Sequence, residues 1–322
     1  MLTTDPEYDC LGAKTDKKYN NYGRNYIWFA ALGAADLVEA RTESSGQIIK
    51  VPLSHNIQGC SQETIEHTQH IESISELCIS REKLIYQALP KNPNILDCLA
   101  ITDRGILLPY HELGNVRDYL QHQQVTTYLR DRWIKNAIDA ITVLHIHTHS
   151  VIHADISPRN FLVADDLSIK LCDFAGSAIS DLEPFVQEED RYRISPWSPR
   201  TFKTDIFALG CLVYELSTGL RPYHDIDDLE EVGRRYAVQT FPSLDGLRYQ
   251  DIIYKCWTCQ YETVEILRGD YDRCIGHGNG LDEWPGWRVK SSLLETPFIS
   301  LVLGIVSAGS IFFWSYQRRS RQ

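Results

Sequence analysis

Two aspartates and an asparagine in the middle of the sequence have the types and spacing that phosphoryl transfer requires. Asp155 and Asn160 lie five residues apart, and Asp173 follows thirteen residues after Asn160. A carboxylate can orient a hydroxyl nucleophile and accept its proton, and carboxylate and amide oxygens are the ligands that Mg²⁺ prefers. We therefore interpret Asp155 as a catalytic residue and Asn160 and Asp173 as candidate ligands of a magnesium ion.

The stretches around these residues resemble the motifs of eukaryotic-type protein kinases. Residues 151–163 (VIHADISPRNFLV) are similar to the catalytic loop of that family, and residues 173–175 (Asp-Phe-Ala) resemble its Asp-Phe-Gly metal motif. Residues 204–219 resemble the buried helix whose aspartate, here Asp205, braces the backbone of the catalytic loop. The resemblance covers residues from about 26 to 268, and in detail it is most similar to small kinase-like proteins common in fungi.

The resemblance implies that ATP and Mg²⁺ bind and that the γ-phosphate passes to a protein hydroxyl, of Ser or Thr rather than Tyr. Lys50 looks like the strand lysine that contacts the α- and β-phosphates of ATP. Glu82 would be its ion-pair partner, with Glu72 and Glu76 as alternatives. Residues 29–38 stand where the family has its glycine-rich loop. They keep a single glycine, and an acidic residue near the phosphates would weaken ATP binding. The residues expected to line the nucleotide site are Gly33, Val38, Lys50, Tyr110, His111 and Leu162.

Several departures from the family pattern leave other functions open. Ala154 stands where an arginine usually pairs with a phosphorylated activation loop, Ala175 replaces a glycine, and Trp197 replaces a glutamate. Ser157 replaces a lysine that is usual in serine/threonine kinases, which leaves the acceptor hydroxyl open. The first alternative is a pseudokinase that binds or scaffolds without transferring phosphate. The second is a small-molecule phosphotransferase, which shares the His-x-Asp and Asn arrangement.

The elements that must position these residues are strands first and helices later. Residues 47–51 form a β-branched run between Gly46 and Pro52, which predicts a strand. Residues 54–75 are polar and read as a loop, followed by a helix over 76–89. Asn115 is a candidate helix cap, and residues 130–147 and 204–218 have apolar residues at helical spacing. This order predicts an α+β protein with a kinase-like bilobal fold, a β-rich N-lobe and a helical C-lobe.

Domain boundaries follow from the same reading. Residues 1–25 are a polar leader, 26–111 the N-lobe, 112–270 the C-lobe and 271–295 a linker. Residues 296–317 carry no charge and are rich in apolar residues, so they predict a transmembrane helix, followed by a basic tail at 318–322. A buried helix is the alternative for this segment.

The amino-acid composition limits which binding partners and which cellular compartment are expected. The net charge of −11 over 322 residues argues against nucleic-acid binding, because an acidic surface repels phosphate backbones. The nine cysteines are scattered and odd in number, which is typical of a reducing compartment. The polar residues at the start do not form a secretory signal. We therefore expect a membrane-anchored protein whose kinase domain faces the cytosol, or alternatively a soluble cytoplasmic protein, with an unknown protein substrate.

Overall fold

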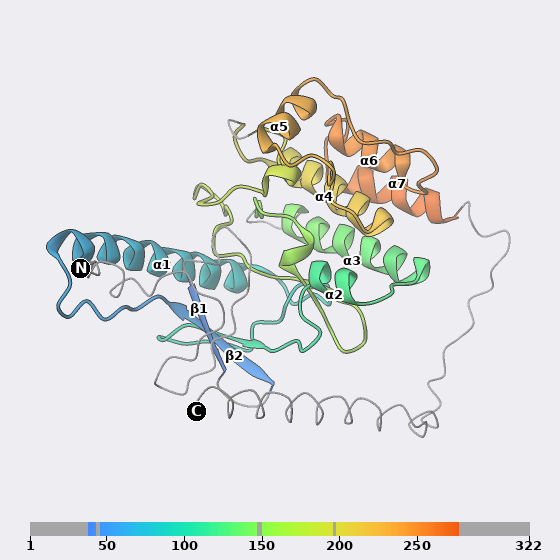
Figure 1. The fold of residues 1–322 in the computed structure, drawn as a ribbon. Coiled ribbons are helices and arrows are strands. Elements are labelled where there is room, and N and C mark those ends of the chain that lie inside the picture. The colour runs from blue at the N-terminus through green and yellow to red at the C-terminus, as the bar shows by residue number, and fades with distance from the viewer. Residues whose placement is uncertain (1–37, 43–45, 147–149, 196–197, 277–322) are drawn as a thin grey trace, which may run out of the picture. The chain divides into compact units, whose positions relative to one another are not determined.

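The computed structural model describes residues 46–146, 150–195 and 198–276 in full and the backbone of residues 38–42. The described residues form a four-stranded antiparallel sheet in the order β1-β2-β4-β3, and a helical part that contains a two-stranded sheet, β5-β6. In Figure 1, β1 and β2 lie beside α1, and helices α2 to α7 make up the other part. Strands and one helix therefore form the first lobe and helices dominate the second, which confirms the α+β class and the two lobes predicted from the sequence.

The four strands of the first sheet are short and place Lys50 at its centre. Lys50 pairs with Ala40 of β1 on one side and with Ile106 of β4 on the other. Its neighbours Ile49 and Val51 are β-branched and buried, and such side chains fit the pleated surface of a sheet. The bounds are β1 Val38–Thr42, β2 Gln47–Pro52, β3 Ala100–Ile101 and β4 Ile106–Pro109.

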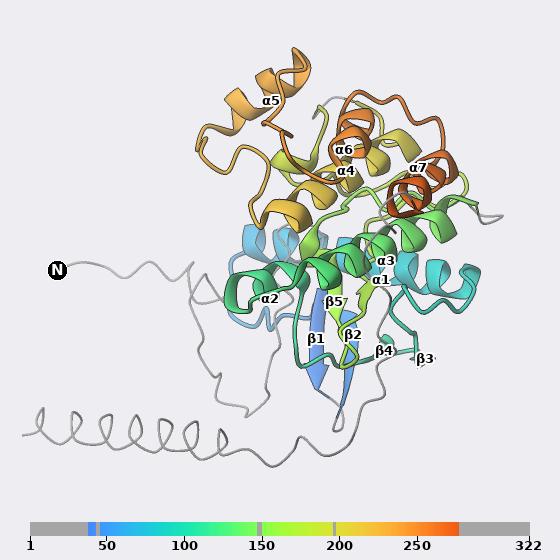
Figure 2. The same cartoon turned by 90° about the vertical axis from the view of Figure 1, so that its right-hand side faces the viewer.

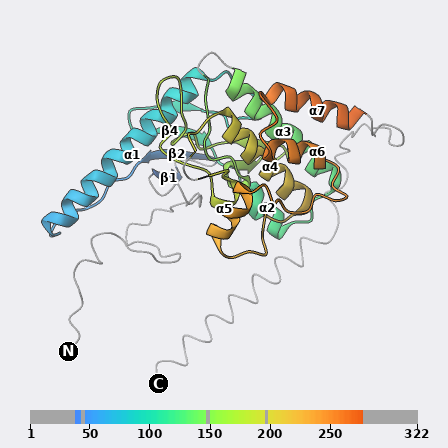
Figure 3. The same cartoon turned by 90° about the horizontal axis from the view of Figure 1, so that it is seen from above.

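Helix α1 (Gln62–Ala88) runs across this sheet and is much longer than the sequence predicted (Figure 3). The interpretation of residues 54–75 as a loop is wrong from Gln62 onward. Ser61 caps the helix by accepting a hydrogen bond from the backbone of Thr64 at 3.2 Å. The first half of the helix is mostly exposed, so it lacks the apolar stripe on which a helix is recognised in a sequence.

The helical part packs around α3 and α4, and β5 lies between α3 and the four-stranded sheet (Figure 2). Asn115 caps α2 as predicted, accepting from the backbone of Asp118 at 3.0 Å. Helix α7 continues to Gly276, past the predicted end of the C-lobe at residue 270, because the ring of Tyr271 is buried against Tyr249. The bounds are α2 Val116–His122, α3 Thr127–Ile146, β5 Phe161–Val163, β6 Ile169–Leu171, α4 Phe202–Thr218, α5 Leu229–Ala237, α6 Gln250–Trp257 and α7 Val264–Gly276.

Gly210 allows α4 to approach α6 closely, and we expect Gly210→Ala to lower the free energy of unfolding by about 1–3 kcal/mol. A Cβ at this position would lie 2.5 Å from Cβ of Cys256, so the two helices would have to move apart. The matched control is Gly233→Ala in α5, where no atom lies within 4 Å of the added carbon. That change should instead stabilise the protein by about 0.5–1 kcal/mol, since alanine is the better helix former. Urea denaturation of both variants measures the difference, and equal effects would contradict the close approach.

None of the helices within the described residues is long and apolar enough to cross a membrane. The predicted transmembrane helix at 296–317 lies outside those residues, as do the leader at 1–25 and the basic tail at 318–322.

Candidate active site

Lys50, Glu82 and Asp173 meet at the junction of the two lobes. The Nζ atom of Lys50 lies 2.7 Å from Oε2 of Glu82 and 2.5 Å from Oδ1 of Asp173. The structure therefore confirms the predicted pairing of Lys50 with Glu82. The two alternatives lie elsewhere, since Glu72 accepts from the backbone of His55 at 2.6 Å and Glu76 is exposed.

This cluster is buried and its charges depend on one another. Burial alone would lower the pKa of Lys50, but the carboxylates of Asp173 and Glu82 raise it above its ordinary value. Burial would raise the pKa of Asp173, yet the neighbouring Lys50 ammonium holds it below its usual range. For Glu82, which is fully buried, burial outweighs Lys50 and raises the pKa. The cluster thus keeps Lys50 charged and Asp173 ionised, as binding of phosphate and metal requires.

The catalytic loop holds Asp155 in a buried position with one oxygen uncommitted. Asn160 donates its side-chain amide to the Asp155 carbonyl at 2.6 Å and to Oδ2 at 3.0 Å. The other oxygen, Oδ1, is buried and finds no hydrogen-bond partner among the described residues. Burial raises the pKa of Asp155 to about 7, which the bond from Asn160 opposes. An oriented carboxylate with a free, basic oxygen is suited to accept a proton.

Phe174 connects the metal motif to both α1 and the catalytic loop. Its ring is fully buried and packs edge-on against Tyr86 of α1 and His153 of the loop, with centroids 5.3 Å and 5.4 Å apart. Its backbone N–H donates to Oε1 of Glu82 at 3.3 Å. Position 175 does not require a glycine. The residue of this motif with a positive φ is Asp173 (φ 67°), and Ala175 is not among the residues with positive φ. The substitution of alanine therefore leaves this motif intact.

Asp205 braces the catalytic loop, as the resemblance predicted. Its carboxylate is fully buried and accepts from the backbone N–H groups of His153 at 2.8 Å and Ala154 at 2.9 Å. Ala154 has φ 63°, a left-handed conformation that costs energy for a residue with a Cβ. The two bonds offset this cost and fix the backbone directly before Asp155.

The structure describes only some of the residues that the sequence predicts to line the nucleotide site. Leu162 is buried in a hydrophobic cluster with Ile48 of β2 and Leu108 of β4. The backbone N–H of Tyr110 donates to the carbonyl of Gly46 at 2.9 Å, and Nε2 of His111 is buried with no partner in the described part of the chain. Val38 begins β1, but only its backbone is described, and Gly33 lies outside the described residues. Their roles with ATP stay predictions.

The oxygen donors at this site suit a magnesium ion. Asn160 uses its amide nitrogen for both bonds to Asp155, so these bonds do not occupy its amide oxygen, which could serve as a ligand together with the carboxylate of Asp173. Within the described residues, no group of three or more His, Cys, Asp or Glu could hold a metal on its own. Mg²⁺ does not need one, because it commonly binds through one or two protein oxygens together with substrate phosphates.

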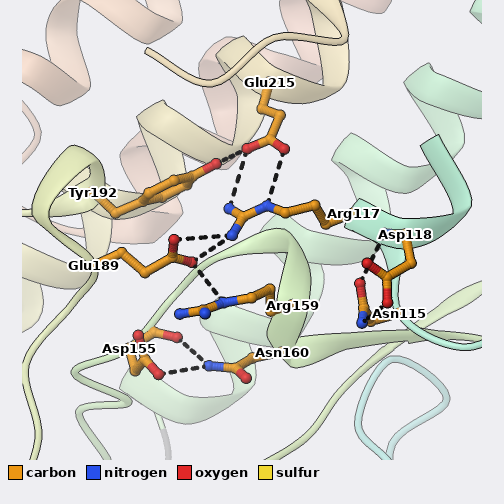
Figure 4. A network of polar contacts seen from close by, with 9 residues as sticks. All are labelled: Asn115, Arg117, Asp118, Asp155, Arg159, Asn160, Glu189, Tyr192 and Glu215. Carbon is orange, nitrogen blue, oxygen red and sulfur yellow. Dashed lines mark hydrogen bonds and ion pairs between the residues drawn. The ribbon is translucent and has the colours of Figure 1, made fainter. Parts of the chain in front are cut away.

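A network of arginines and glutamates beside Asp155 was not predicted from the sequence. Arg117 of α2 pairs with Glu189 at 2.8 Å and with Glu215 of α4 at 3.2 Å, and Arg159 of the catalytic loop pairs with Glu189 at 2.9 Å (Figure 4). The hydroxyl of Tyr192 donates to Glu215. The partners come from four separate segments, and their spacing in the sequence gives no sign that they meet.

Comparison with known proteins agrees with this geometry. Residues 63–258 match the family described as protein kinase domain, a range that includes Glu82, Asp155, Asn160 and Asp173. The serine/threonine/tyrosine-protein kinase HT1 of Arabidopsis thaliana is 23% identical over 58% of this chain and 53% of its own length. The dual specificity protein kinase shkC of Dictyostelium discoideum is 28% identical over 71% of this chain and 50% of its own length.

A third relative, the tyrosine-protein kinase Drl of Drosophila melanogaster, is 30% identical over 50% of this chain and 29% of its own length. The matched region thus spans about half the length of the first two relatives and less than a third of the last. The family match, together with a lysine–glutamate pair and a braced Asp155–Asn160 loop, shows that the chain belongs to the protein kinase domain family.

Proposed function

We propose that the chain is an ATP-dependent protein kinase that transfers the γ-phosphate of ATP to a hydroxyl group of a protein. The observation that carries this proposal is the arrangement of Asp155. Its carboxylate is oriented by Asn160, its backbone is braced by Asp205, and its Oδ1 lacks a hydrogen-bond partner within the described residues. A group prepared in this way supports a reaction in which a hydroxyl proton is removed.

In the proposed mechanism each side chain has a separate task. Asp155 orients the acceptor hydroxyl and takes its proton as the oxygen attacks the γ-phosphorus in line with the leaving ADP oxygen. Lys50, held by Glu82, binds the α- and β-phosphates of ATP. Asn160 and Asp173 would hold Mg²⁺, which supplies positive charge to offset the charge that develops on the phosphates. Lys50 contacts Asp173 directly, so phosphate binding would compete for this lysine.

The nature of the acceptor is a finer part of the proposal. The relatives include kinases described as acting on serine, threonine and tyrosine, and as dual-specificity enzymes. From the sequence we expect serine or threonine rather than tyrosine as the acceptor. Phosphoamino-acid analysis of a labelled protein substrate distinguishes these acceptors.

The proposal is tested by incubating the full chain with Mg²⁺ and γ-labelled ATP, alone and with a generic protein substrate, beside the Asp155→Asn variant. If the wild-type chain transfers label to protein and the Asp155→Asn variant does not, the chain is a protein kinase. Label in a small-molecule acceptor only would support the phosphotransferase alternative. A chain that binds ATP but transfers no label above the variant would be a pseudokinase, and the proposed function would be wrong.

A further inference from the structure

Glu189 lies where the catalytic loop meets the segment that follows the metal motif, here called the activation segment (residues 176–195). Both of its carboxylate oxygens accept from Nη1 of Arg117, at 2.8 Å and 2.9 Å, and Oε1 lies 2.9 Å from Nε of Arg159. Because Arg159 lies between Asp155 and Asn160, the carboxylate of Glu189 links the activation segment to the catalytic loop and, through Arg117, to α2.

The network continues from Glu189 into the core of the helical lobe. Arg117 donates through Nε and Nη2 to Glu215 at 3.2 Å and 3.3 Å, and Glu215 accepts from Tyr192 (Figure 4). Arg117, Glu215 and Tyr192 are buried. Burial would raise the pKa of Glu189, but Arg117 and Arg159 hold it below its usual range. Two arginines therefore balance two glutamates, and removing one member would leave a buried charge without its partner.

We propose that Glu189 is a positioning residue, a permanent carboxylate that holds the activation segment on the catalytic loop, so that transfer does not require phosphorylation of this segment. The inference rests on the proposed function for its catalytic part. A phosphate would act by pairing with arginines, and Arg117 and Arg159 already pair with carboxylates.

Three further observations support a permanent anchor. Ala154, directly before Asp155, carries no charge that could bind a phosphate. The hydroxyl of Tyr192 is engaged with Glu215 and its side chain is fully buried, so it is not accessible for modification in this conformation. Arg81 of α1 also fixes the activation segment, through the carbonyls of Ser177 at 2.5 Å and Glu183 at 2.9 Å. The segment is thus held by charges that the folded chain itself supplies.

The first experiment measures amide hydrogen exchange in the full chain and does not depend on transfer activity. We expect Glu189→Gln to increase exchange at residues 186–195 and 155–160 by about tenfold or more, since the activation segment loses charged hydrogen bonds from Arg117 and the catalytic loop loses the ion pair of Arg159. Glu189→Asp keeps the charge and should recover most of the protection. Glu230→Gln, in an exposed ion pair of α5, is the matched control and should change nothing at these residues. Unchanged exchange in Glu189→Gln would overturn the proposal.

The second experiment measures transfer by phosphatase-treated protein whose lack of phosphate is verified by intact mass. The untreated and treated wild-type chains should have equal kcat. Glu189→Gln should lower kcat by about tenfold or more, with KM for ATP nearly unchanged because the Lys50 cluster is not altered. Glu189→Asp should restore it. A wild-type chain that is active only when its activation segment is phosphorylated would contradict the proposal. If no form transfers phosphate, the proposed function fails, and hydrogen exchange still decides whether Glu189 anchors the segment.

Discussion

Replacing Asp155 with asparagine is expected to lower kcat for γ-phosphate transfer by about 10²- to 10⁴-fold, the usual contribution of a positioned acid or base. Asparagine has nearly the same size and shape as the aspartate that it replaces. The oxygen of the new amide can still accept from Asn160, as Oδ2 of Asp155 does at 3.0 Å. Its NH₂ group then stands where Oδ1 has no partner among the described residues, so a donor replaces the acceptor of the substrate proton.

The same variant should keep its nucleotide site, which separates a catalytic role from a structural one. Lys50, Glu82 and Asp173 hold one another without help from Asp155. We therefore expect the dissociation constant for Mg·ATP, measured by calorimetry, to change by no more than about threefold, less than the effect of one typical hydrogen bond. Asp103→Asn, in an exposed turn of the first lobe, is the control and should leave kcat unchanged. Equal activity of Asp155→Asn and wild type would exclude Asp155 as the catalytic residue.

The parts of the site that were predictable from the sequence are those whose geometry is local. Asp155 and Asn160 belong to one short loop, so their spacing already places them together. The strand at Lys50 follows from a β-branched run between Gly46 and a proline. The pairing of Lys50 with Glu82 needed the family resemblance, because several glutamates of α1 were possible partners by spacing alone.

The parts that were missed depend on contacts between distant segments or on weak patterns. Arg117 and Glu215 are 98 residues apart and Arg117 and Glu189 are 72 apart, and no periodicity marks which buried cation meets which carboxylate. The start of α1 was missed because its first turns face solvent and carry no apolar stripe. A usable signal was nevertheless present, since Ser61 is a good N-cap and Glu63 lies in the first turn, where a negative charge favours a helix.

Removing the carboxylate of Asp205 is expected to cause the largest loss of stability among the site residues. In Asp205→Ala, the backbone N–H groups of His153 and Ala154 lose their acceptor inside the core, as does Nε2 of His145 at 3.1 Å. An unsatisfied buried donor costs about 1–3 kcal/mol, so two backbone donors imply about 2–6 kcal/mol of unfolding free energy. Asp205→Asn keeps one acceptor and should lose about half as much. Urea denaturation measures both, with Asp272→Asn on the exposed face of α7 as the control.

Removing the carboxylate of Asp205 should also lower kcat, because Asp205 holds Ala154 in a strained backbone conformation. Ala154 keeps φ 63° only while its N–H is bonded, and without that bond it can relax to an ordinary conformation. Such a change would rotate the backbone directly before Asp155 and move its carboxylate away from the acceptor site. In Asp205→Asn, at a temperature where the variant is still folded, we therefore expect kcat to fall while KM for ATP stays nearly constant. A variant that loses stability but keeps kcat would show that the strain at Ala154 is maintained by the surrounding core and not by Asp205.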